Sequence, residues 1–148
     1  YIELEDKTDY TGSCFDELDA MLVNLKKEAL RYMNNHLITE DDYYYEYMQM
    51  RARQCVILKR IYADIIRLTT TPEQGKALAD FIRQTADEFA EQNNVETLLS
   101  ELERLHRYYE QQQLPVTRQE FENRSMLYHI LEDMKAFLDI KKDFITAR

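Results

Sequence analysis

The sequence predicts an all-α fold, an up-and-down antiparallel bundle of four to five helices, two of them long. Three observations predict this class. The 148 residues include only two glycines and two prolines, too few for the many turns of an all-β protein. Apolar residues make up 45% of the chain, including 11 tyrosines and 6 phenylalanines, which is enough to bury a core. Apolar residues also recur at spacings of three and four, as in amphipathic helices.

The first half of the chain is expected to hold a lead-in segment and two helices. Residues 1–12 are acidic and have no clear period, so we expect a lead-in there and a single helical-bundle domain over residues 13–146. The first helix is predicted over residues 13–35. Its apolar stripe comprises Phe15, Leu18, Leu22, Leu25, Ala29, Tyr32 and Met33. The second helix is predicted to follow a cap at Thr39 and to end near Leu68. Its stripe comprises Tyr44, Met48, Arg51, Cys55, Leu58, Tyr62 and Ile65.

The second half is expected to hold the remaining helices. Thr71 and Pro72 suit the start of a third helix, and the pair Asn93-Asn94 ends or kinks it. Its stripe comprises Leu78, Phe81, Ile82, Ala86 and Phe89. The fourth stripe comprises Val95, Leu98, Leu99, Leu102, Leu105 and Tyr109. Thr117 and Glu120 form a capping box for the last helix. Its stripe comprises Phe121, Arg124, Tyr128, Leu131, Met134 and Leu138. Short connections make successive helices antiparallel neighbours.

Charge and hydropathy restrict the partners. The chain carries 19 basic and 28 acidic side chains, a net charge of −9, so it repels phosphate backbones and we expect no nucleic-acid partner. The longest run without a charged residue is eight residues, over 32–39, whereas a membrane span needs about 20 apolar residues. The chain begins with Tyr1 instead of methionine, which we interpret as the start of an excised piece of a longer protein.

Catalytic, metal and cofactor chemistry find little support. Glu103 and His106 form the single Glu-x-x-His pair, whereas a di-metal bundle needs two such pairs. The two cysteines form no CxxC motif, and no His/Cys cluster has zinc spacing. The serines lie in no nucleophile-elbow motif, and two glycines cannot build a phosphate-binding loop. We therefore expect no catalytic residue, no metal and no cofactor, and we interpret the protein as a non-enzyme.

A cluster of tyrosines opens the second predicted helix. Four of the five residues over 43–47 are tyrosines, and consecutive residues point around the whole helix, so they cannot all lie in one core. One interpretation is packing on another helix or on a membrane-embedded part of a longer protein. The other is an aromatic ligand surface.

Arginines interrupt two of the apolar stripes. Arg51 lies between Met48 and Cys55, and Arg124 lies between Phe121 and Tyr128. A guanidinium facing a core is costly unless it is paired, so one interpretation is a structural ion pair with a carboxylate of a facing helix. The other is a pair of donors for a small aromatic carboxylate. The candidate ligand-binding residues are then Arg51, Arg124, Tyr44, Tyr47 and Tyr128.

The same residues carry a resemblance to a known family. YMQMRARQ over residues 47–54 and FENRSMLY over residues 121–128, with Leu131-Glu132-Asp133, resemble the C-terminal domain of the Gram-positive putative aromatic acid exporter family. The resemblance implies a soluble helical domain on the cytoplasmic side of the membrane, joined to the transmembrane part of the same longer protein. It also implies a role in assembly of a homo-oligomer, in gating, or in sensing a substrate. The alternative is a free-standing helical protein-interaction module, such as an adaptor.

Overall fold

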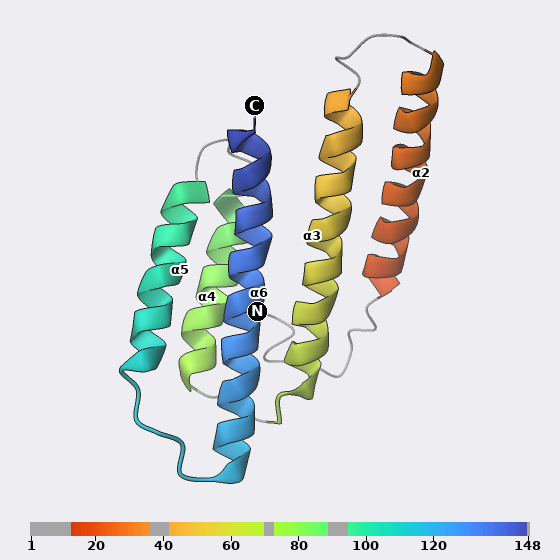
Figure 1. The fold of residues 1–148 in the computed structure, drawn as a ribbon. Helices are drawn as coiled ribbons and strands as arrows, with labels where there is room; N and C mark the ends of the chain where they lie inside the picture. The colour runs from red at the N-terminus through yellow and green to blue at the C-terminus, as the bar shows by residue number, and fades with distance from the viewer. Residues whose placement is uncertain (1–12, 36–41, 70–72, 89–94, 148) are drawn as a thin grey trace.

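The fold is an all-α bundle, as the composition predicts. The computed structural model describes residues 13–35, 42–69, 73–88 and 95–147. These residues form five helices: α2 (Ser13–Asn35), α3 (Asp42–Arg67), α4 (Glu73–Glu88), α5 (Val95–Glu110) and α6 (Arg118–Thr146). Successive helices run in opposite directions, and α3 and α6 are the longest, with 26 and 29 residues (Figure 1). The predicted up-and-down bundle with two long helices is therefore confirmed.

Several sequence expectations lie outside the described residues. They concern the lead-in over residues 1–12, the caps at Thr39 and Thr71, and the break at Asn93-Asn94. The same holds for the predicted core side chains of Phe15, Leu18, Ala29, Tyr32, Met33 and Phe89.

The start of α6 shows how local sequence fixes a helix boundary. Thr117 is the N-cap, and its side chain accepts a hydrogen bond of 3.1 Å from the backbone N–H of Glu120. The Glu120 carboxylate in turn accepts a bond of 2.8 Å from the backbone N–H of Val116. The capping box is confirmed, with the carboxylate reaching one residue beyond the cap. The orphan backbone N–H of Glu120, in the first turn of α6, is thereby satisfied.

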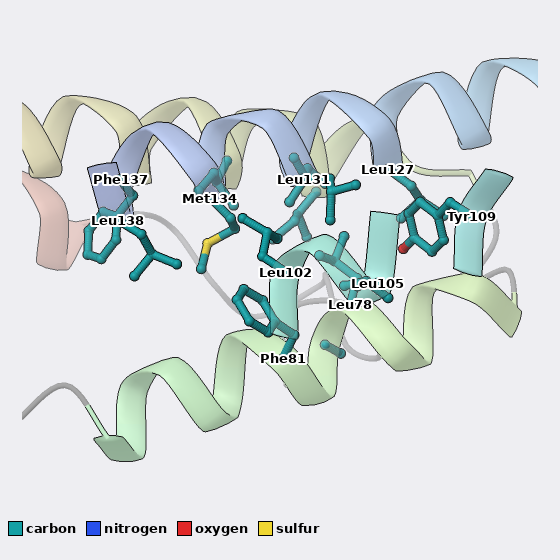
Figure 2. Packing of buried hydrophobic residues seen from close by; sticks show 14 of the residues in the cluster. Leu78, Phe81, Leu102, Leu105, Tyr109, Leu127, Leu131, Met134, Phe137 and Leu138 are labelled. Atoms are coloured by element: carbon teal, nitrogen blue, oxygen red, sulfur yellow. The ribbon is translucent and has the colours of Figure 1, made fainter. Parts of the chain in front are cut away.

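The hydrophobic core lies between α3, α4, α5 and α6. Figure 2 shows Leu131 and Met134 of α6 pointing toward Leu102 of α5 and Phe81 of α4. Along α6 the buried apolar residues are Leu127, Ile130, Leu131, Met134, Phe137 and Leu138. Full burial of one such side chain contributes about 1.5–3 kcal/mol relative to exposure. This face makes α6 the central helix of the core.

Four predicted core positions are wrong. Tyr44 is 63% exposed and Phe121 is 60% exposed. In α3 the buried face is rotated relative to the predicted stripe because α3 packs against both α2 and α6. That face comprises Met50, Gln54, Cys55, Ile57, Ile61, Asp64 and Ile65. In the first turns of α6 the buried positions are Asn123 and Leu127, so Phe121 points outward. Leu25 of α2 and Ala86 of α4, also placed in core stripes, are exposed as well.

α2 stands apart from the core and packs against α3 (Figure 1). Among its described side chains Leu22 alone is buried, whereas Met21, Val23 and Leu30 are exposed. None of the described helices combines the length and the apolar character that crossing a membrane requires.

Polar side chains fix how α3 and α6 align. The Gln54 side chain donates to the Phe137 carbonyl at 3.1 Å, and this contact is buried. Fifteen residues after Gln54, just past the end of α3, the backbone N–H of Thr69 donates to the Asn123 side chain at 3.2 Å. Because these contacts join residues 83 and 54 positions apart in sequence, they set the antiparallel register of the two helices.

Candidate functional site

The structure divides the predicted ligand-binding residues into two groups. Arg51 lies one turn from Gln54, which contacts Phe137 of α6. Arg124 lies 137 − 124 = 13 residues before Phe137 on the same helix. At 1.5 Å per residue this separation is about 20 Å. Arg51 and Arg124 are therefore not brought together, and a single carboxylate cannot contact both.

The first group surrounds Arg51. Its Nε donates to Tyr47 Oη and its Nη1 donates to Gln54 Oε1, both at 3.0 Å. The guanidinium carbon lies 5.0 Å from the centre of the Tyr47 ring, a cation–π contact. Arg51 is thus engaged by two neighbours in its own helix, Tyr47 and Gln54.

The tyrosines of this group form an aromatic cluster with the end of α6. The Tyr47 ring lies 5.9 Å from Phe144, and the Tyr43 ring lies 5.5 Å from the same residue. Tyr44 packs edge-on against Tyr43 and is otherwise exposed. The cluster packs on another helix, as one interpretation expected, but it leaves Tyr43 and Tyr44 open to solvent.

Lys141 adds positive charge to this end of the bundle. It is buried, and burial lowers its pKa, with the nearby Arg51 charge lowering it further. Burial also raises the pKa of Cys55, which is a buried free thiol beside Arg51. These shifts indicate a well-packed helix junction.

The second group lines a pocket at the start of α6. The pocket has a volume of about 500 Å³ and is lined by Arg124, Tyr128, Tyr109, Phe121, Leu114 and Pro115. It lies where the connection between α5 and α6 passes the first turns of α6. Arg124 and Tyr128 are one turn apart on α6, so both side chains lie on the same face.

Hydrogen bonds and ring contacts hold the side chains that line this pocket in place. Arg124 donates to the Gln113 carbonyl of the connection. The rings of Tyr109 and Tyr128 lie 5.5 Å apart and nearly perpendicular. Tyr109 donates through its hydroxyl to the Gln74 carbonyl at 2.9 Å, and burial raises its pKa. The pocket thus presents one guanidinium beside aromatic rings that are fixed by packing.

The charge at the far edge of the pocket is mixed. Glu110, Glu132 and His129 also line it. The hydrogen bond that His129 donates to the Asp64 carboxylate raises the pKa of His129, and the Asp64 charge raises it further. His106 packs edge-on against Tyr128 and lies 3.3 Å from Glu110. Two glutamates at one edge favour a ligand with a single carboxylate, placed against Arg124.

The sequence did not indicate Tyr109, His129 or Phe121 as pocket residues. Tyr109 was placed correctly on a core stripe, and one edge of its ring still reaches the pocket. Phe121 was assigned to the core. The available signal was the apolar run Leu114-Pro115-Val116 in the connection, because apolar residues exposed in a loop often mark a binding surface.

Comparison with known proteins adds evidence of family. The family model described as "Putative aromatic acid exporter C-terminal domain" matches residues 1–142. "Uncharacterized protein YqjA" of Bacillus subtilis (strain 168) is 30% identical over 141 residues, which cover 95% of this chain and 44% of that protein. This chain therefore spans less than half the length of that relative.

A solved structure has the same fold. It is described as the crystal structure of a putative membrane protein from Clostridium difficile 630. The two structures superpose with a TM-score of 0.86 at 29% sequence identity, over 97% of this chain and 86% of that chain. The arrangement of helices described above thus recurs in a related protein.

Proposed function

Because the chain belongs to the putative aromatic acid exporter C-terminal domain family, we propose that it is a regulatory, non-catalytic domain of an aromatic acid exporter. In this proposal it is joined to the transmembrane part of the same longer protein and lies on the cytoplasmic side of the membrane. Its match to 44% of the length of YqjA supports a domain of a longer protein over a free-standing adaptor. The regulatory signal is a small aromatic carboxylate bound at Arg124.

The observation that carries this proposal is the pocket that unites Arg124 with Tyr109, Tyr128 and Phe121. A guanidinium can donate two parallel hydrogen bonds to a carboxylate. Aromatic side chains supply flat apolar area and prefer edge-to-face or offset contacts with a second ring. The volume of about 500 Å³ falls within the range of about 300–1,000 Å³ that is typical of small-molecule sites.

Of the candidate residues, Arg124 and Tyr128 thus fit a ligand site best. Arg51 is about 20 Å away by the helix rise, and Tyr47 and Tyr44 lie still farther along the same helix. We assign this second group a structural role at the junction of α3 with the end of α6.

The test is a thermal-shift titration with a matched panel of compounds. Benzoate and 4-hydroxybenzoate offer both a ring and a charge, benzamide lacks the charge, and cyclohexanecarboxylate lacks the aromatic ring. A ligand at 100 times its dissociation constant stabilises the fold by about 2.7 kcal/mol. For a domain of this size this corresponds to a rise of about 5–10 °C in Tm.

Variants locate the site. Arg124→Met should abolish the shift, and Arg124→Lys should weaken it, because lysine keeps the charge but loses the paired donors. Arg51→Met is the matched control, a second seam arginine beside a tyrosine, and should leave the shift unchanged. A wild-type protein that responds to no aromatic carboxylate, or equal loss in both methionine variants, contradicts the proposal.

A second candidate function is assembly, and the outer surface of α2 favours it. Val23 and Leu30 are exposed there and lie seven residues apart, on one face of the helix. In this proposal that face contacts a second copy of the chain. Sedimentation equilibrium would show a concentration-dependent dimer that the Val23→Glu variant abolishes. A strictly monomeric protein at high concentration contradicts assembly through this domain.

A further inference from the structure

Three ligand-type side chains meet between α3 and α6. Asp64 of α3 lies 2.6 Å from His129 of α6, measured from Oδ2 to Nδ1. Asp133 follows His129 by about one helical turn, and its carboxylate lies near the same two side chains. One nitrogen or oxygen atom from each of the three residues lies within 4.8 Å of the other two. Asp64 and Asp133 are buried, with 7% and 6% of their surface exposed, whereas His129 faces solvent.

One oxygen of this cluster is unsatisfied. Asp133 Oδ1 accepts a hydrogen bond of 2.9 Å from Arg60, an ion pair with a half-exposed guanidinium. Asp133 Oδ2 is buried and has no hydrogen-bond partner among the described residues. An unsatisfied buried carboxylate oxygen is costly, and native structures rarely keep one without a ligand, an ion or a water. This oxygen therefore indicates a missing partner.

We propose that Asp64, His129 and Asp133 form a binding site for a divalent transition-metal ion of the zinc type. An imidazole nitrogen with two carboxylate oxygens is a three-ligand set that zinc accepts at about 2.0–2.2 Å, with a fourth position open to solvent. The imidazole excludes calcium and magnesium as preferred ions, since both select oxygen ligands. The ion neutralises two buried carboxylates and takes the place of the proton shared by Asp64 and His129.

The site is independent of carboxylate binding at Arg124, although His129 borders that pocket. Its ligands could not be recognised from spacing, because His129 and Asp133 are one turn apart whereas Asp64 is 65 residues from His129. Their meeting depends on the antiparallel register of α3 and α6. The sequence expectation of no metal rested on a search for Glu-x-x-His pairs and for His/Cys clusters with zinc spacing, and this set is neither.

The test uses chelator-stripped protein and Zn²⁺ alone, followed by isothermal titration calorimetry. We expect one zinc ion per chain in the wild type. His129→Gln should weaken binding by at least about tenfold. His106→Gln is the matched control, because His106 also lies beside two carboxylates, Glu110 and Glu132, which are exposed. The control should bind zinc as the wild type does. Both cysteines are present in every variant, so any binding to thiols is common to all.

A second variant tests the cluster without removing a ligand. Arg60→Gln deletes the cation that competes for Asp133, so it should tighten zinc binding several-fold. Circular dichroism checks that each variant is folded. Cobalt gives an independent readout, because Co²⁺ in a site with few ligands absorbs visible light, and this band should be absent in His129→Gln.

Three results would overturn the metal site. They are a stripped wild-type protein that binds no zinc, His129→Gln binding as tightly as wild type, and equal losses in His129→Gln and His106→Gln. If His129→Gln fails to fold, Arg60→Gln with unchanged or weaker zinc binding overturns the proposal in the same way. A metal site that is confirmed while aromatic carboxylates give no thermal shift would separate this inference from the proposed regulatory function.

Discussion

α2 and α6 are long amphipathic helices that lie against the same helix, α3, and they are covered to very different extents. α6 packs against α3, α4 and α5, so an apolar residue is buried at almost every turn. α2 packs against α3, and of its described side chains Leu22 alone is buried. The difference shows that an apolar stripe reveals that a helix has a neighbour, but not how many neighbours it has.

The two interfaces with α3 also show different described polar contacts. α3 and α6 share buried or half-buried hydrogen bonds at Gln54, Arg60, Asp64 and Thr69. Between α2 and α3 the described contact of this kind is Lys26 over the Tyr45 ring, at 5.7 Å. Both of these side chains are half-buried. The α3–α6 interface carries polar contacts at several points along its length.

The largest expected effect comes from matched leucines in the two helices. Leu138→Ala in α6, at a position with no exposed surface, should lower the free energy of unfolding by about 2–5 kcal/mol. Leu22→Ala in α2, which is 9% exposed and faces one helix, should cost less than half as much because the site can relax toward solvent. Urea denaturation followed by circular dichroism measures both. Equal costs would place α2 in the same cooperative core and break the comparison.

A smaller effect is expected where Asn123 ties α6 to the end of α3. The buried Asn123 side chain accepts from the Thr69 N–H and exchanges bonds with its hydroxyl. Asn123→Ala should cost about 1–3 kcal/mol because it removes the half-buried hydrogen bonds to Thr69, which contribute about 0.5–1.5 kcal/mol each. Gln119→Ala removes an exposed donor to the same hydroxyl and should cost under about 0.5 kcal/mol. The same urea titrations decide, and equal costs would mean that burial of Asn123 contributes nothing.

Native-state hydrogen exchange sharpens the comparison without any mutation. Amides of α2 should exchange at least about tenfold faster than those in the middle of α6, a difference of about 1.4 kcal/mol in opening free energy. The amides around Leu22 and Leu131 give a suitable pair. Uniform protection across both helices would show that α2 opens only when the whole domain unfolds.

The smallest expected effect concerns the charges beside the aromatic cluster. Burial and the Arg51 charge both lower the pKa of Lys141, so the unfolded state binds this proton more tightly than the folded state. Stability from this group therefore rises with pH between the lowered pKa and the ordinary value of 10.5. Arg51→Met should raise the pKa of Lys141 part of the way back, since burial is the larger cause. A titration followed by NMR of the lysine side chain measures it, and an unchanged pKa would mean that Arg51 does not act on Lys141.

Local signals in the sequence predicted the helices well. The helix predicted over residues 13–35 has the bounds of α2, and Thr117 caps α6 through Glu120 as its spacing indicates. Stripes on helices with one dominant neighbouring surface were also correct, as for α5. Tyr44 and Phe121 were misplaced because the direction of a buried face depends on which helices lie alongside, and this is not a local property.

Buried polar residues could not be predicted for a related reason. A polar side chain can be buried here only where a hydrogen-bond partner from a distant part of the chain lies at the same level along the bundle. This holds for Gln54, Asn123 and Asp133. Only part of the candidate site could be predicted from the sequence. Arg124 and Tyr128 are one turn apart and do share a pocket, whereas Arg51 joins them only if the helices align differently. The sequence predicts which residues share a face of one helix. The register between two helices depends on the whole fold and cannot be read from either helix alone.

The contacts between α3 and α6 also determine how this domain can move. They recur along α3 at Gln54, Arg60, Asp64 and Thr69, so sliding α6 by one helical turn, about 5.4 Å, would break all of them at once. Shear between these two helices is thus strongly opposed. A displacement at Arg124 would therefore have to move α3 and α6 together, as one rigid pair.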